Sequence, residues 1–211
     1  MMDKKLWKEL NNMLENSKSN IKHIGGDPSI GFSAVEELKL NENTTLATII
    51  LYVAGLTINK CLRILGQGND ELQGICQVNE VKNGTPTKIK GFLIVATDIF
   101  GGIYAMNIDE IDGKVGQIFY FAPDTLEWES LEMKYSQFLY WAVNGNTEEF
   151  YSSMKWSDWE KYADETGFDQ GILIYPFLWS KEIEIESATK KIVPFVELIN
   201  VNMDFRRKFF E

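Results

Sequence analysis

The sequence contains one histidine, His23, and two cysteines, Cys61 and Cys76, among its 211 residues. A zinc site normally needs three or four Cys, His or carboxylate ligands, and His23 stands in a loop-rich stretch without a neighbouring cysteine. A Ser–His or Cys–His nucleophile pair would have to use this one histidine as its base. The cysteines form no Cys-x-x-Cys motif, so we expect two reduced, buried thiols. The sequence predicts no metal, no cofactor and no catalytic residue.

Basic residues and long apolar runs are scarce. The chain has 21 Lys and Arg against 31 Asp and Glu, for a formal net charge of −10, whereas a nucleic-acid binder needs a basic footprint for phosphate. The longest apolar run, residues 46–56, is much shorter than the roughly 20 residues of a bilayer span. The first residues have no apolar region of the signal-peptide kind. We therefore expect a cytoplasmic protein that binds neither nucleic acid nor membrane.

Glycine-rich phosphate loops are also missing. Gly66 and Gly68 are followed neither by a third glycine of a dinucleotide motif nor by the Lys-Ser/Thr of a P-loop. Gly101 and Gly102 stand between two predicted strands, where a hairpin turn requires them. Neither pair therefore indicates a nucleotide site.

What remains is typical of one α+β domain. Residues 17–43 read as loop-rich with at most a short helix, Thr44 or Thr45 caps a buried helix that Gly55 ends, and Ser157 with Glu160 forms a capping box. Turns are expected at residues 59–60, 98–102 and 112–113. We predict helices over residues 3–16, 44–53, 134–143, 147–151, 158–165 and 204–210. We predict strands over residues 56–58, 61–65, 92–97, 103–107, 117–122, 125–129, 172–179, 182–186 and 192–201, in one largely antiparallel sheet.

The negative charge is confined to one part of the chain. Residues 124–186 hold fourteen acidic and four basic residues, while the remainder is balanced. Such a surface either aids solubility alone or steers a basic partner into contact. Tryptophan and tyrosine, which are frequent interface anchors, are dense in the same part. The candidate partner-binding residues are Asp124, Glu127, Trp128, Glu129, Glu132, Glu148, Glu149, Asp158 and Glu160.

Several motifs resemble a known family. They are RILGQGN at residues 63–69, FLIVATD at 92–98 with the glycines at 101–102, GQIFYFAPDTLEWE at 116–129, YSQFL at 135–139, FY at 150–151 with tryptophans at 156 and 159, and QGILIYPFLW at 170–179. Together they resemble the bacterial domain of unknown function 2625 family, which looks like a branch of the SUKH superfamily. They cover residues 44–201, within a single domain of residues 1–211 in which residues 1–43 form a helical and loop-rich extension.

The resemblance implies an α+β fold with a strongly bent, mostly antiparallel sheet. It also implies a non-enzymatic protein that binds a cognate toxin, often a nuclease, and it supplies no catalytic residues. Two other functions fit the residues: an intracellular scaffold or regulator whose acidic face is incidental, and a carboxylate-dependent hydrolase. The hydrolase would need a deep pocket that holds two carboxylates with displaced pKa values, and a structure with Asp98, Asp124 and Glu127 solvated and far apart would exclude it. The oligomeric state does not follow from the sequence.

Overall fold

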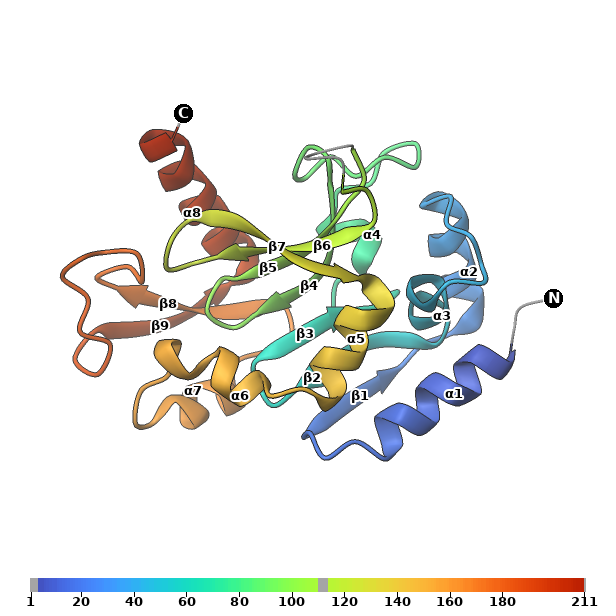
Figure 1. The fold of residues 1–211 in the computed structure, drawn as a ribbon, viewed down its shortest axis with the longest axis horizontal. Coiled ribbons are helices and arrows are strands. Elements are labelled where there is room, and N and C mark those ends of the chain that lie inside the picture. Colours follow the sequence, from blue (N-terminus) through green and yellow to red (C-terminus); the bar gives the residue numbers. More distant parts are fainter. Residues whose placement is uncertain (1–3, 110–113, 211) are drawn as a thin grey trace.

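A computed structural model describes residues 4–109 and 114–210 and shows an α+β fold in one domain, as predicted (Figure 1). Seven antiparallel strands form the main sheet in chain order, and two further strands form a separate hairpin. The predicted turn at residues 112–113 lies outside the described residues. The strands of the main sheet are β1 (Ile21–Gly25), β2 (Val53–Ile58), β3 (Leu62–Leu65), β4 (Phe92–Asp98), β5 (Ile103–Asn107), β6 (Gln117–Ala122) and β7 (Glu127–Lys134), and those of the hairpin are β8 (Gln170–Tyr175) and β9 (Thr189–Pro194).

The helices cover the sheet at both of its ends. The first three helices gather near β1 and β2, whereas the last helix and the β8–β9 hairpin lie at the opposite end (Figure 1). Every residue of β4, the middle strand, is buried, as its continuous apolar run predicted. The helices are α1 (Lys4–Glu15), α2 (Pro28–Glu37), α3 (Thr45–Tyr52), α4 (Ile75–Val78), α5 (Tyr135–Asn144), α6 (Thr147–Phe150), α7 (Trp159–Glu165) and α8 (Phe195–Phe210), with a short 3₁₀ helix, η2 (Ser152–Met154). Among these elements, no helix has the length and apolar character that a membrane crossing requires.

Residues 17–43 contain more regular structure than predicted. They hold β1, which pairs antiparallel with β2, and the ten-residue helix α2. Asp27 caps α2 by accepting a hydrogen bond from the Ser29 backbone N–H over 2.8 Å, and Pro28 occupies the first helical position. The Asp-Pro pair is therefore a helix start, and the prediction of a loop-rich segment was wrong because Asp-Pro suits a helix N-terminus as well as a turn.

The helix around residues 45–52 is confirmed, but Gly55 does not end it. Thr44 caps α3 by accepting a hydrogen bond from the Ala47 N–H over 3.2 Å, and the helix ends where Val53 adopts extended backbone angles. Gly55 lies inside β2, where an added Cβ atom would stand 2.7 Å from the ring of Phe168. The glycine therefore makes room for an aromatic ring.

The turns that connect the first strands are confirmed. Asn59 and Lys60 adopt positive φ angles of 47° and 62° between β2 and β3, a conformation that suits a tight hairpin. Residues 98–102 connect β4 to β5, and Gly101 there has a φ of 100°.

Four predictions in the last third of the chain were wrong. Ser157 does not cap α7, because its backbone N–H and its hydroxyl both donate to the carboxylate of Glu186. Asp158 occupies the cap position without a side-chain cap bond, so Glu160 completes no capping box. Residues 182–186 form turns and irregular backbone in place of the predicted strand. The predicted strand at residues 192–201 is divided at Pro194, which ends β9, and α8 begins nine residues before residue 204.

Candidate functional site

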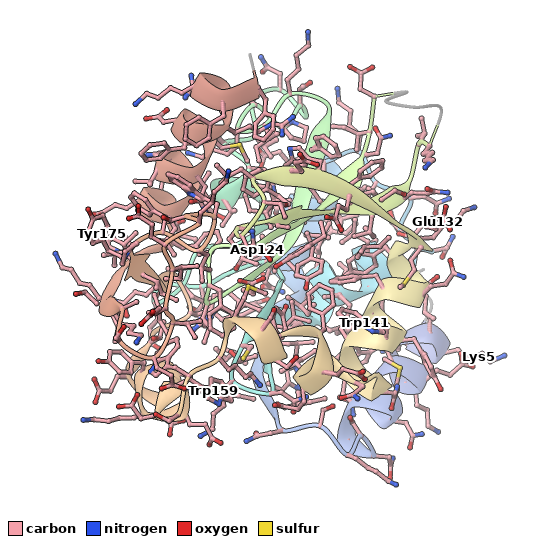
Figure 2. All side chains as sticks on the ribbon, turned by 60° about the vertical axis from the view of Figure 1, so that its left-hand side comes forward. Lys5, Asp124, Glu132, Trp141, Trp159 and Tyr175 are labelled. Carbon is pink, nitrogen blue, oxygen red and sulfur yellow. The ribbon has the colours of Figure 1, made fainter. Side chains whose placement is uncertain are left out.

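The acidic residues of α6 and α7 lie exposed on neighbouring helices. Glu148 and Glu149 belong to the first turn of α6, and Asp158 and Glu160 stand at the start of α7. Figure 2 shows α7, marked by Trp159, at the lower left of the face that carries Asp124 near its middle. The structure therefore places these four predicted residues, 148, 149, 158 and 160, on one exposed part of the surface.

Two of these carboxylates are neutralised locally. Glu148 pairs with Lys155, whose ammonium also lies 3.9 Å from the centre of the Trp159 ring. Glu160 pairs with Lys60 at 3.0 Å. Within the described chain, Glu149 and Asp158 form no ion pair, so their charge is directed to solvent.

Other acidic residues join this group although they were not among the predicted ones. Asp164 and Glu165 are exposed on α7, and Asp164 lies 2.9 Å from Lys60. Glu186 is brought beside the start of α7 by its hydrogen bonds to Ser157. Asp164 and Glu165 could have been found from their helical spacing to Glu160 and Lys161, whereas the position of Glu186 depends on a tertiary contact.

The carboxylates of β7 project toward the side of the sheet that α6 covers. Glu129 stands opposite Tyr120 in the β6–β7 register, and Glu127 stands opposite Ala122, so each pair shares a face. Tyr120 packs on Phe150 of α6 at a ring distance of 5.2 Å. Glu127 and Glu129 are therefore turned to the same side as the acidic residues of α6.

Asp124 is exposed in the β6–β7 turn, and Glu132 lies apart from the rest. Asp124 is near the middle of the view in Figure 2, whereas Glu132 lies at the edge opposite Trp159. Glu132 has a positive φ of 56° where β7 departs from its regular register. We define the acidic face by the exposed residues that share one side, namely Asp124, Glu127, Glu129, Glu148, Glu149, Asp158, Glu160, Asp164, Glu165 and Glu186.

Trp128 does not belong to the acidic face. Strand alternation turns it to the opposite side of β7 from Glu127 and Glu129. There its ring stacks on Phe92 at 4.5 Å and contacts Phe121 at 5.3 Å. Half-buried in this way, Trp128 lines a groove of about 810 Å³ that also holds Arg206. Trp128 therefore lies in a groove with a basic side chain, whereas Glu127 and Glu129, its neighbours in sequence, lie on the acidic side of β7.

Asp98 is fully buried at the end of β4, whereas Asp124 and Glu127 are exposed. The Asp98 carboxylate accepts hydrogen bonds from the backbone N–H groups of Phe100 and Gly102, both over 2.9 Å. Burial raises the pKa of Asp98 to about 6. This carboxylate organises the turn between β4 and β5, and the structure does not bring the three acids together in an open pocket.

The histidine and the cysteines occupy structural positions. His23 lies on β1, with its ring 6.1 Å from that of Trp7, and burial lowers its pKa. Cys61 and Cys76 are free, and burial raises the pKa of both thiols to about 12. Among the described residues, no three His, Cys, Asp or Glu side chains gather as metal ligands would.

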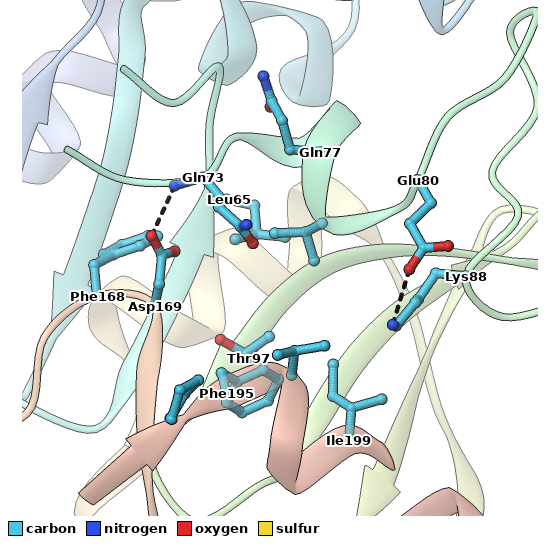
Figure 3. Close-up of a pocket in the computed structure, with 13 residues that line it drawn as sticks. Leu65, Gln73, Gln77, Glu80, Lys88, Thr97, Phe168, Asp169, Phe195 and Ile199 are labelled. Atoms are coloured by element: carbon cyan, nitrogen blue, oxygen red, sulfur yellow. Dashed lines mark hydrogen bonds and ion pairs between the residues drawn. The ribbon is translucent and has the colours of Figure 1, made fainter. Parts of the chain in front are cut away.

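A pocket of about 380 Å³ opens elsewhere, and none of the predicted partner-binding residues lines it. It lies between α4, the turn at Phe168 and Asp169 and the first turn of α8, beside the ion pair of Glu80 and Lys88 (Figure 3). Sequence patterns carry little signal for this pocket, because its walls come from three segments that are distant in the chain.

The family described as "Protein of unknown function DUF2625" matches residues 1–198. The chain is 28% identical over 204 residues to an uncharacterised protein, YbfG, of Escherichia coli (strain K12), covering 96% of this chain and 93% of that protein. It is 27% identical over 207 residues to an uncharacterised protein of Haemophilus influenzae (strain ATCC 51907 / DSM 11121 / KW20 / Rd), covering 96% and 91%. No solved structure matches the chain.

These matches extend the resemblance seen in the motifs. The part of the chain predicted to resemble the family began at residue 44, whereas the family match includes residues 1–43, which hold α1, β1 and α2. Both relatives are described as uncharacterised, so membership of the SUKH superfamily stays a prediction. The chain belongs to the DUF2625 family of proteins of unknown function.

Proposed function

We propose that this protein is a non-enzymatic, cytoplasmic protein-binding module of the SUKH type. In this proposal it acts as a bacterial immunity protein that neutralises a cognate toxin by covering a basic surface. The observation that carries the proposal is the gathering of exposed carboxylates from β7, α6 and α7 on one side of the molecule. The partner is a protein, and neither nucleic acid nor membrane takes part.

Electrostatics gives the proposal its physical basis. A nuclease binds the phosphates of its substrate, so its active site is cationic. The charge of an acidic inhibitor is complementary to that of such a site. Long-range attraction between the two surfaces accelerates their encounter at low ionic strength. Glu149 and Asp158, which form no ion pair in the described chain, are free to pair with basic residues of the partner.

The closest alternative is a scaffold or regulator that uses the same face for a partner that is not toxic. The two functions differ in the effect of the partner by itself. Producing the captured partner alone in the native host stops growth if it is a toxin, and co-production of this protein then restores growth. A harmless partner would favour the scaffold.

Capture from native lysate with charge-reversed variants tests the binding face. The test variant carries Glu127→Lys, Glu129→Lys and Asp158→Lys, whose carboxylates accept no hydrogen bond in the described structure. The matched control carries Glu36→Lys, Glu42→Lys and Glu71→Lys, which are exposed, lie outside the acidic face and change the net charge equally.

We expect the wild type and the control to retain the same partner, and the test variant to lose it. Equal retention by all three proteins would contradict the proposed face. Recovery of no specific partner by the wild type would contradict the proposed function.

A further inference from the structure

The pocket beside α8 has a buried floor. Leu65, Thr97, Phe195 and Ile199 form it, and each is less than 9% exposed. Its walls are polar or half-buried and come from α4, the turn at residues 168–169 and the first turn of α8 (Figure 3). A volume of about 380 Å³ lies at the small end of the range of ligand pockets, about 300–1,000 Å³.

The floor contains one polar group without a partner. Thr97 is 4% exposed, and in the described chain its hydroxyl makes no hydrogen bond to protein. The buried unpartnered side-chain atoms of the described chain do not include this hydroxyl oxygen, so it is open to the pocket and accessible to a bound molecule. Because the Thr97 hydroxyl lines the pocket, a ligand hydroxyl that enters the pocket would satisfy it.

The wall next to the floor supplies further hydrogen-bonding groups. Asp169 accepts a hydrogen bond from the Gln73 backbone N–H over 2.9 Å through Oδ2, and its backbone carbonyl accepts one from the Phe195 N–H over 2.8 Å. These two bonds fix the carboxylate between α8 and the segment before α4. The side-chain amide of Gln73 makes no hydrogen bond in the described structure, so it is available to a ligand.

The charges around the pocket are nearly balanced. Glu80 and Lys88 form an ion pair at 2.9 Å on one side. On the other side, the buried guanidinium of Arg63 acts electrostatically on Asp169 and lowers its pKa, whereas partial burial, the larger effect, raises it. An anion would face the Asp169 carboxylate, and a purely apolar ligand would displace water from the Thr97 hydroxyl and from the Asp169 carboxylate without offering either a new hydrogen bond.

These features together select a neutral molecule that has several hydroxyl groups and an apolar face. We propose that the pocket binds a neutral monosaccharide or disaccharide, whose hydroxyls pair with the Thr97 hydroxyl, the Asp169 carboxylate and the Gln73 amide. The C–H face of the sugar packs on Phe195 and Phe168. The pocket is separate from the acidic face, so the site does not depend on the proposed protein partner.

Saturation-transfer NMR on the intact chain tests the site. The probes are D-glucose, D-galactose, D-mannose, N-acetyl-D-glucosamine, maltose and lactose, with inorganic phosphate as the anionic comparison. We expect at least one sugar to bind and phosphate not to compete with it. Thr97→Val and Asp169→Asn should each weaken sugar binding about tenfold, which is the loss of one hydrogen bond.

A matched control separates loss of the site from loss of the fold. Thr57→Val alters a threonine of β2 that does not line this pocket, and it should leave sugar affinity unchanged. Thr97→Val breaks no hydrogen bond within the described protein, so its thermal unfolding should match that of the wild type. Failure of all six sugars to bind, preferential binding of phosphate, or unchanged affinity in Thr97→Val would each overturn the proposal.

Discussion

The hydroxyl of Tyr120 donates a hydrogen bond to Oδ2 of Asp98 over 3.0 Å, inside the protein. The other carboxylate oxygen accepts the N–H groups of Phe100 and Gly102. One buried carboxylate thereby fixes the turn between β4 and β5 and ties it to β6. The β4–β5 turn and the contact of this turn with β6 therefore both depend on the Asp98 side chain.

Replacement of Tyr120 by phenylalanine removes one donor from this buried carboxylate. We expect Tyr120→Phe to lower the free energy of unfolding by about 1–3 kcal/mol at neutral pH, because the charged group loses a hydrogen bond that no water replaces. Urea unfolding of the wild type and of Tyr120→Phe measures this difference in the free energy of unfolding. Tyr140→Phe is the control, since Tyr140 is 63% exposed and its change should stay within about 0.5 kcal/mol. Equal effects of the two changes would show that the Tyr120 bond contributes nothing.

The stability of the fold should depend on pH through Asp98. Burial raises the pKa of Asp98 to about 6, so between about pH 4 and pH 6 the folded protein retains a proton that the unfolded chain has released. Stability from this group is therefore present at low pH and is lost as pH rises through 6. The difference corresponds to about 3 kcal/mol at most.

Asp98→Asn removes this titration and keeps an acceptor for the backbone donors. We expect the unfolding free energy of the wild type, relative to Asp98→Asn, to fall by up to about 3 kcal/mol between pH 4 and pH 7. Denaturant unfolding at a series of pH values measures the difference. Parallel pH profiles for the two proteins would contradict the assignment.

Gly102 should tolerate no side chain. An added Cβ atom would lie 2.1 Å from Asp98 Oδ2 and 2.5 Å from the Tyr120 hydroxyl oxygen. Because these groups are buried and hydrogen-bonded, we expect Gly102→Ala to cost more than about 3 kcal/mol or to prevent folding. Gly25→Ala is the control, since no atom lies within 4 Å of its added Cβ, and its melting temperature should change little. Similar melting temperatures for both variants would refute the close packing at Gly102.

Asn79 should hold α4 against β4. Its side-chain N–H groups donate to the carbonyls of Ile75 and Ile94, both over 2.8 Å, and its oxygen accepts the Ile94 N–H over 2.7 Å. Asn79→Ala leaves buried backbone groups unpaired, so we expect a loss of about 2–4 kcal/mol and faster hydrogen exchange at the Ile94 amide. Asn43→Ala, at an exposed position, should change neither the free energy of unfolding nor the hydrogen exchange of the Ile94 amide. Unaltered exchange at Ile94 would be incompatible with this role.

The sequence predicted the elements whose pattern is local. The strands at residues 92–98, 103–107 and 117–122 and the α5 helix follow from apolar periodicity and turn residues. The predicted strand at residues 192–201 was wrong because Ile, Val and Phe occur both in strands and in buried helices. The partition of these residues at Pro194 depends on the packing of Phe195, Leu198, Ile199 and Asn202 in the core.

The sequence predicted which residue types form the candidate site but not how their side chains are arranged in space. The acidic side chains of β7, α6 and α7 are exposed, as their residue types indicated. Trp128 turns to the opposite side of β7 from Glu127 and Glu129, as side-chain alternation along the predicted strand at residues 125–129 requires, so grouping it with its acidic neighbours was wrong. The pocket at Thr97 and Asp169 was not foreseen, since residues 72 positions apart in the chain meet there only in the folded protein.

The association rate of the captured partner with this protein, measured by stopped-flow fluorescence at increasing salt, tests the role of the acidic face most directly. Screening of opposite charges should lower the rate constant about tenfold or more between low and high ionic strength. The variant with Glu127→Lys, Glu129→Lys and Asp158→Lys should be slow at every salt concentration. A rate constant that is independent of salt and equal in wild type and variant would contradict binding through this face.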